Sequence, residues 1–181
     1  MFEPLPSSWK TERLHMEDLT AELVLQVQQL YESSQYLGEW DGNIERKPDY
    51  IMKCLAEGEL PPNGKKENYR MQTIKRLEDG RIVGYFTIYH GFPNDDITYI
   101  AFMYIDRSCQ RQGYAAEVIK GLTSELTRLN YRAIRLNVAL KNWPGIRFWL
   151  HSGFTTITTI HGDVECSEHT FANIELERVI R

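Results

Sequence analysis

Apolar residues recur every three or four positions in two stretches of the chain, as they do along one face of a helix. The first stretch predicts a helix over 21–32, and the second predicts a longer helix over about 112–130. The apolar positions are Leu23, Val27, Leu30 and Tyr31 in the first, and Ala115, Ile119, Leu122, Leu126 and Leu129 in the second. Shorter helices are predicted over 49–57 and 144–152, where Pro144 suits a helix start.

Other stretches are rich in β-branched and aromatic residues and predict strands. The segments 69–77 and 82–89 flank Glu78-Asp79-Gly80-Arg81, which is a strong hairpin signal. Residues 97–105 are apolar almost throughout, which predicts a strand in the middle of the sheet with both faces covered. Further strands are predicted over 11–18, 133–138, 154–160 and about 170–177. These elements together predict a mixed α/β sheet.

Composition limits the classes of function. The chain has 181 residues, of which 42% are hydrophobic, enough for one sizeable core, so we expect one domain over 1–181. A net charge of -4 argues against a nucleic-acid partner, which would require a concentrated excess of Lys and Arg. No apolar run is long enough to span a bilayer, and residues 1–10 do not resemble a signal peptide, so a cytoplasmic protein without membrane contact is expected.

Cysteine usage gives no sign of a disulfide framework or a metal site. Cys54, Cys109 and Cys166 are odd in number and share no CxxC or Cys/His spacing, so we expect no bound metal. The sequence from 38 to 64 is broken by glycines and prolines. It predicts loops that either shape a substrate site or only connect the surface.

The segment Ile105-Asp-Arg-Ser-Cys-Gln-Arg-Gln-Gly-Tyr-Ala115 joins a predicted buried strand to the long helix. A helix amino end has unpaired amides and a partial positive charge, which suit a pyrophosphate. Gly113 lets the main chain approach a ligand, and Arg111 can add hydrogen bonds to phosphate oxygens. The bare pattern also fits a plain strand-to-helix turn.

A second segment follows the strand that ends at Val138. Asn142 precedes a helix start, and Phe148-Trp149 and Ser152-Gly153-Phe154 follow it. Asn142 could close a turn or donate its amide to a ligand carbonyl or phosphate.

The two segments together resemble the GNAT superfamily of N-acetyltransferases. The phosphate-binding pattern of that family, Q/R-x-x-G-x-G/A, matches Gln110, Gly113 and Ala115, and its later pattern matches Asn142, Trp149 and Gly153-Phe154. The opening Thr11-Glu-Arg-Leu14 is similar to the first strand of many members. The resemblance covers about residues 11–177 and implies a mixed, mostly antiparallel sheet flanked by helices.

The resemblance also implies a reaction, the transfer of an acetyl group from acetyl-CoA to a primary amine by direct attack. It places the main chain of Tyr104 and Ile105 against the cofactor arm, as thioester and oxyanion contacts. The residues implied to hold the cofactor are Tyr104, Ile105, Gln110, Arg111, Gln112, Gly113, Tyr114, Ala115, Asn142 and Trp149.

The chain departs from the family where many members carry a Tyr that protonates the leaving thiolate. Trp149 takes that position, and its indole is a hydrogen-bond donor but no practical acid. Either CoA leaves unassisted, or another residue acts, or catalysis has been lost. The catalytic acid and base therefore stay open, and a CoA-binding sensor without turnover is the alternative function.

Several titratable residues are candidates for the base that deprotonates the amine, although each also fits an exposed or structural role. These candidates are Glu32, Glu39, Asp95, Asp96, His90 and His151. The aromatic residues between Tyr31 and Trp40 either line an acceptor pocket or pack beneath the loop, and Cys109 is expected to be a buried spectator. The acceptor is a small-molecule or peptide amine, and a homodimer through the last strands would suit such a domain.

Overall fold

The computed structural model describes residues 3–181, which form one eight-stranded sheet with the order β1-β2-β3-β4-β5-β6-β8-β7. Every neighbouring pair is antiparallel except β5 and β6, which run parallel. The strands are β1 (Ser8–Lys10), β2 (Leu14–Asp18), β3 (Tyr69–Arg76), β4 (Ile82–His90), β5 (Ile97–Ile105), β6 (Ala133–Ala139), β7 (Thr156–Gly162) and β8 (Ala172–Val179). The predicted mixed, mostly antiparallel sheet is confirmed.

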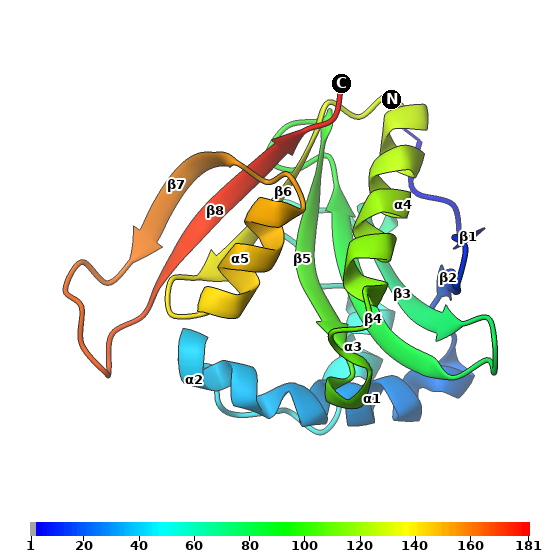
Figure 1. Ribbon diagram of the computed structural model, residues 1–181, viewed down its shortest axis with the longest axis horizontal. Coiled ribbons are helices and arrows are strands. Elements are labelled where there is room, and N and C mark those ends of the chain that lie inside the picture. The colour runs from blue at the N-terminus through cyan, green and yellow to red at the C-terminus, as the bar shows by residue number, and fades with distance from the viewer. Residues whose placement is uncertain (1–2) are drawn as a thin grey trace.

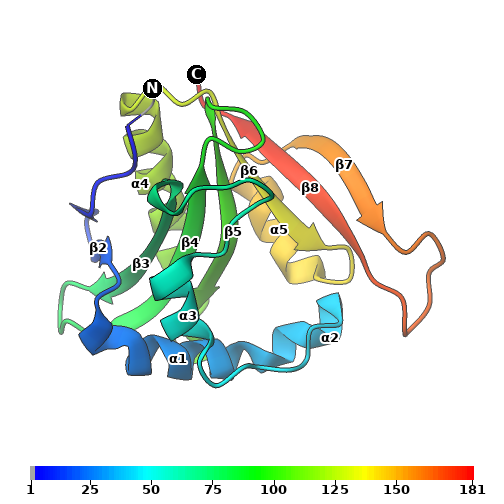
Figure 2. The same ribbon diagram turned by 180° about the vertical axis from the view of Figure 1, so that it is seen from behind.

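Helices cover both faces of the sheet. In Figure 1, α4 and α5 lie in front of the strands, and Figure 2 shows α1 and α3 across the opposite face. The helices are α1 (Val24–Ser33), α2 (Gly38–Asp41), α3 (Tyr50–Glu57), α4 (Tyr114–Arg128) and α5 (Trp143–His151), with 3-10 turns η1 (Ala21–Leu23), η2 (Ser34–Leu37), η3 (Lys66–Asn68) and η4 (Arg107–Cys109). Within residues 3–181, no helix has the length and apolar character needed to cross a membrane.

The two faces of the sheet bury two separate hydrophobic cores. Because side chains alternate along a strand, neighbours such as Tyr85 and Phe86 point to opposite faces. The α4-side core contains Phe86 and Ile105 together with the apolar face of α4. The α1-side core contains Tyr85 and Tyr104 together with residues of α1 and α3. The spacing of apolar residues predicted both α1 and α4.

Pairing between β5 and β6 is confined to the first half of β5. It runs from Ile97 opposite Ala133 to Ile100 opposite Leu136 and then stops, although both strands continue. The register between β4 and β5 also shifts here, because Thr87 faces Phe102 while Ile88 faces Ile100. Ala101 is therefore an extra residue that forms a β-bulge at the point where the two strands separate.

Several sequence predictions need correction. The strand predicted over 11–18 is β2, which begins at Leu14. Neither β1 nor α2 was predicted, since a three-residue strand and a four-residue helix are too short for a periodic signal. The last two strands lie two residues further along than expected. The middle strand is not covered throughout, because Ala101 is exposed and Phe102 and Met103 are half-buried.

His90 is a structural residue at the far end of the sheet from the turn that follows Ile105. The main-chain N–H of Leu5 donates to its Nε2 at 3.1 Å, and Nδ1 lies 3.1 Å from the Thr98 hydroxyl. Burial lowers the pKa of His90 to about 4, and the charge of Arg70 acts in the same direction. Of the two roles that the sequence left open for His90, a base near the acceptor and a structural residue, the structure favours the structural one.

Stability should fall in acid because of His90. Its folded pKa of about 4 lies below its ordinary value of 6.5. The contribution of neutral His90 to the free energy of unfolding is therefore complete above pH 6.5. That contribution, about 3 kcal/mol at most, is lost as the pH falls from 6.5 to 4. Urea unfolding at pH 7 and pH 4.5 should show a smaller loss for His90→Gln than for the wild-type protein. An equal loss in both would contradict this assignment.

Candidate functional site

The separation of β5 from β6 leaves an opening that is bordered by main-chain groups of β5. The N–H of Asp106 donates to the carbonyl of Val83 in β4. In an antiparallel pair, every second residue of a strand forms main-chain hydrogen bonds with the neighbouring strand. Tyr104, two residues before Asp106, therefore also directs its main-chain groups toward β4. The main-chain groups of Met103 and Ile105 point the other way, toward the opening. Of the two main-chain contacts predicted from the sequence, Ile105 faces the opening and Tyr104 does not.

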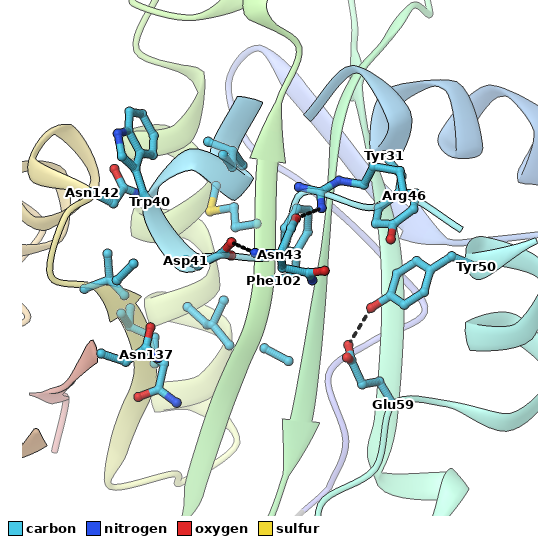
Figure 3. Close-up of a pocket in the computed structure, with 18 of the residues that line it drawn as sticks. Tyr31, Trp40, Asp41, Asn43, Arg46, Tyr50, Glu59, Phe102, Asn137 and Asn142 are labelled. Atoms are coloured by element: carbon cyan, nitrogen blue, oxygen red, sulfur yellow. Dashed lines mark hydrogen bonds between the residues drawn. The ribbon is translucent and has the colours of Figure 1, made fainter. Parts of the chain in front are cut away.

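A cavity of about 490 Å³ occupies this opening and continues between the sheet and the α1–α3 cover. The bulge residue Ala101 lines it. Phe102 of β5 and Asn137 of β6 line it as well, from the two separated strands (Figure 3). Aromatic residues predicted as possible pocket residues divide into two groups. Tyr31 and Trp40 line the cavity, whereas Tyr36 packs against the Tyr104 ring with 6.5 Å between centroids.

The turn from β5 into α4 has the features of an anion site. Arg111 and Gly113 have positive φ angles of 63° and 83°, and Gly113 is the N-cap of α4 without a side-chain cap. Within the described residues, the amides of 111–116 donate to no protein acceptor, and the first amide of α4 that does so is Glu117, to the Gly113 carbonyl. A run of unpaired amides at a helix amino end is electropositive and open to an anion.

Gln110 does not present its side chain to this turn. Its Nε2 donates to the Ile105 carbonyl at 2.9 Å and to the Tyr36 hydroxyl at 3.0 Å. The side chain therefore fixes the end of β5 and ties it to η2. Cys109 is buried, as expected for a spectator thiol.

Asn142, the N-cap of α5, and Trp149 within α5 line the cavity from the side of β6. The Oδ1 of Asn142 accepts from the Gly145 amide at 2.9 Å, so the side chain caps the helix, and its Nδ2 has no acceptor within the described part of the chain. The Trp149 ring meets the rings of Phe148 and Phe154 edge to face, with centroids 4.8 and 5.2 Å away. Both residues, predicted from the second motif, are brought to one cavity, while the turn at 110–115 lies beyond the cavity lining.

The remaining base candidates lie away from the cavity. Asp96 pairs with Arg132 at 2.9 Å, and Asp95 precedes it in the same loop, before β5 begins. His151 ends α5 with its Nδ1 at the Arg147 carbonyl. Glu32 and Glu39 are exposed and do not line the cavity. For these four carboxylates and His151 the structure favours the exposed or structural role that the sequence left open beside the catalytic one.

The carboxylates that do line the cavity are Asp41, Glu45 and Glu59. They come from the irregular stretch around 38–64, so its loops do shape this cavity. Asp41 accepts from the Asn43 amide at 2.8 Å and belongs to a local turn. Glu59 is held differently, because its Oε2 accepts from the Tyr50 hydroxyl at 2.9 Å (Figure 3). No local sequence signal separates Glu59 from other exposed glutamates.

Tyr50 is fixed in place by its ring. It stacks on Tyr31 with centroids 4.3 Å apart. Burial, followed by the charge of Glu59, raises the pKa of the Tyr50 hydroxyl. Tyr50 therefore remains a neutral hydrogen-bond donor that orients one oxygen of Glu59 and leaves the other available.

Comparison with protein families identifies the class of this fold. The model of the Acetyltransferase (GNAT) family matches residues 26–154. No curated protein matches the sequence closely enough to count as a relative.

Solved structures with the same fold share little sequence with this chain. A probable GNAT-family acetyltransferase from Chromobacterium violaceum superposes with a TM-score of 0.76 at 10% identity, covering 99% of this chain and 89% of that one. The spermidine N-acetyltransferase of Vibrio cholerae, solved with CoA and spermine, gives 0.72 at 13% identity, with 93% and 96% covered. A putative phosphinothricin N-acetyltransferase gives 0.70 at 15%, with 93% and 99% covered. At these identities the likeness establishes the fold.

Removing the Gln110 amide should destabilise the protein. Gln110→Ala removes the amide that donates to the Ile105 carbonyl and to the Tyr36 hydroxyl. We expect a loss of about 1–2 kcal/mol in the free energy of unfolding. The matched control is Gln112→Ala, whose exposed side chain makes one 3.3 Å bond to Ser108 and should cost less than about 0.5 kcal/mol. Urea denaturation measures both, and equal losses would refute a structural role for Gln110.

Proposed function

Because the chain belongs to the acetyltransferase (GNAT) family, we propose that it transfers an acetyl group from acetyl-CoA to a primary amine by direct attack. This family uses acetyl-CoA, which supplies the acetyl group as a thioester. The observation that carries the proposal is the run of unpaired amides at 111–116, at the end of the strand that borders the opening. It offers hydrogen-bond donors where a pyrophosphate needs them.

The residues around the opening fit an extended cofactor. The turn 110–115 would hold the phosphates, with Arg111 as an exposed cation beside them. The main-chain groups of Met103 and Ile105 face the gap left by β6, where the amides of a pantetheine arm would restore the missing strand pairing. An N–H of β5 there would also stabilise negative charge that develops on the thioester oxygen.

The acceptor side of the cavity supports an amine. An alkyl ammonium has a pKa of about 10 and must lose a proton before it attacks. We propose Glu59 as the group that receives the ammonium and accepts its proton, because Tyr50 holds one of its oxygens and the other is free. The Trp40 ring in the same cavity suits the cationic form of the acceptor, whereas the Tyr31 ring already faces Arg46, 5.1 Å from its centroid.

The leaving thiol has less need of the protein. Its pKa of about 8.5 makes it a fair leaving group without a proton donor. Trp149 lies at the cavity wall with an indole N–H that can donate a hydrogen bond but not a proton. The same residue supports the alternative function, a domain that binds CoA or an acyl-CoA without turnover.

Binding and turnover separate these two functions. We expect the protein to bind CoA and acetyl-CoA at micromolar strength by calorimetry, and to release thiol when amines are added. Gly113→Glu should weaken CoA binding about 100-fold, because it adds a negative charge at the turn. Gly91→Glu is the matched control, since Gly91 also has a positive φ, of 77°, but lies at the other end of the sheet.

Each outcome assigns the function differently. Binding that is lost in Gly113→Glu, with thiol release for some amine, supports the transferase. Binding without release for any amine in a broad panel supports the sensor. Absence of binding in the wild-type protein contradicts both.

Glu59→Gln tests the acceptor side. We expect kcat/KM for the amine to fall about 100-fold, the usual size of a general-base contribution, with CoA affinity unchanged. Glu57→Gln at the exposed end of α3 is the control and should retain full activity. Full activity of Glu59→Gln would remove Glu59 from the mechanism.

A further inference from the structure

Arg13 reaches the phosphate turn from the other end of the sequence. It directly precedes β2, yet its Nη1 donates to the Gln112 carbonyl at 3.0 Å. Its guanidinium lies over the Tyr114 ring, 4.8 Å from the centroid, and its Nη2 comes within 3.3 Å of the place where a Cβ on Gly113 would be. No part of the turn motif predicts this contact, because 99 residues separate Arg13 from Gln112.

The main partner of Arg13 is Glu117, in the first turn of α4. The Nε of Arg13 donates to Glu117 Oε2 at 2.7 Å, and its main-chain N–H donates to Oε1 at 2.8 Å. The Thr11 hydroxyl donates to the same Oε1 at 2.6 Å. Burial alone would raise the pKa of Glu117, but these hydrogen bonds outweigh it and lower the pKa, so the carboxylate stays charged.

A charged carboxylate at this position conflicts with the proposed function of the turn. Negative side chains compete with a phosphate for the positive end of the helix. Of the other arginines near the turn, Arg76 pairs with Asp79 and Arg81 with Asp106, and Arg111 makes no ion pair within the described residues. The cation in direct contact with Glu117 is Arg13, at 2.7 Å.

We propose that Arg13 is a positioning residue that keeps the amino end of α4 receptive to an anion by neutralising Glu117. This proposal rests on the proposed function, because it concerns the phosphates of CoA at the same turn. Arg13 acts through Glu117 and the Gln112 carbonyl. With its carbonyl held toward Arg13, the planar peptide of Gln112 and Gly113 directs the Gly113 N–H away from Arg13.

The test is a double-mutant cycle of CoA affinity, measured by calorimetry at low salt. Arg13→Gln should weaken CoA binding about tenfold, the effect of one uncompensated unit charge about 10 Å from another at an effective dielectric constant of about 20. Glu117→Gln should tighten binding several-fold, because Arg13 is then an uncompensated cation. Arg13→Gln/Glu117→Gln should return to within about twofold of the wild-type protein.

Pantetheine, which carries no phosphate on the arm, is the control ligand and should bind all four proteins equally. A double variant as weak as Arg13→Gln would show that Arg13 contacts the ligand itself or only supports the fold, and would overturn the proposal. Unchanged affinity in Glu117→Gln would also overturn it, even if Arg13→Gln does not fold. Absence of CoA binding in the wild-type protein would instead refute the proposed function.

Discussion

Main-chain N–H and C=O groups inside a protein need partners, and between β5 and β6 the strand pairing that supplies them ends at Ile100 and Leu136. The rest of the site follows from this one interruption. It exposes the main chain of β5 along the second half of the strand and opens a cavity beside it. It also allows α5 and the α1–α3 cover to contribute side chains from opposite sides. A continuous sheet of the same strands would have no site.

The two ends of the opening have different chemistry. At the carboxyl end of β5, main-chain amides and the helix dipole create a positive environment suited to anions. At the other end, Tyr31 and Tyr50 stack beside Glu59, and the cavity is lined by both acidic residues and the basic Arg46 and Lys47. Gln110 connects the two, since its amide joins the Ile105 carbonyl to Tyr36 of η2. The end of β5 and the segment that follows α1 are therefore directly connected.

What the sequence could predict depended on how local each feature is. The left-handed Gly113 and the capping role of Asn142 are set by a few neighbouring residues, so their patterns were visible, as was the hairpin around Gly80. Arg13, Glu59 and the facing of Met103 depend on contacts or registers that only the folded chain creates. The sequence left the base open among several candidates for the same reason. An acidic residue carries no local mark of the cavity that it will line.

The bulge at Ala101 makes separate demands on one strand. In a regular strand, residues an even number of positions apart point to the same face. Ile100, Met103 and Ile105 all face the α4-side core, although Ile100 is separated from the other two by three and five positions. A strand without Ala101 would alternate regularly and would fill both cores with the same side chains. The strand is thus one residue longer than its packing requires. The packing of the two cores does not account for Ala101, so its effect falls on the opening between β5 and β6.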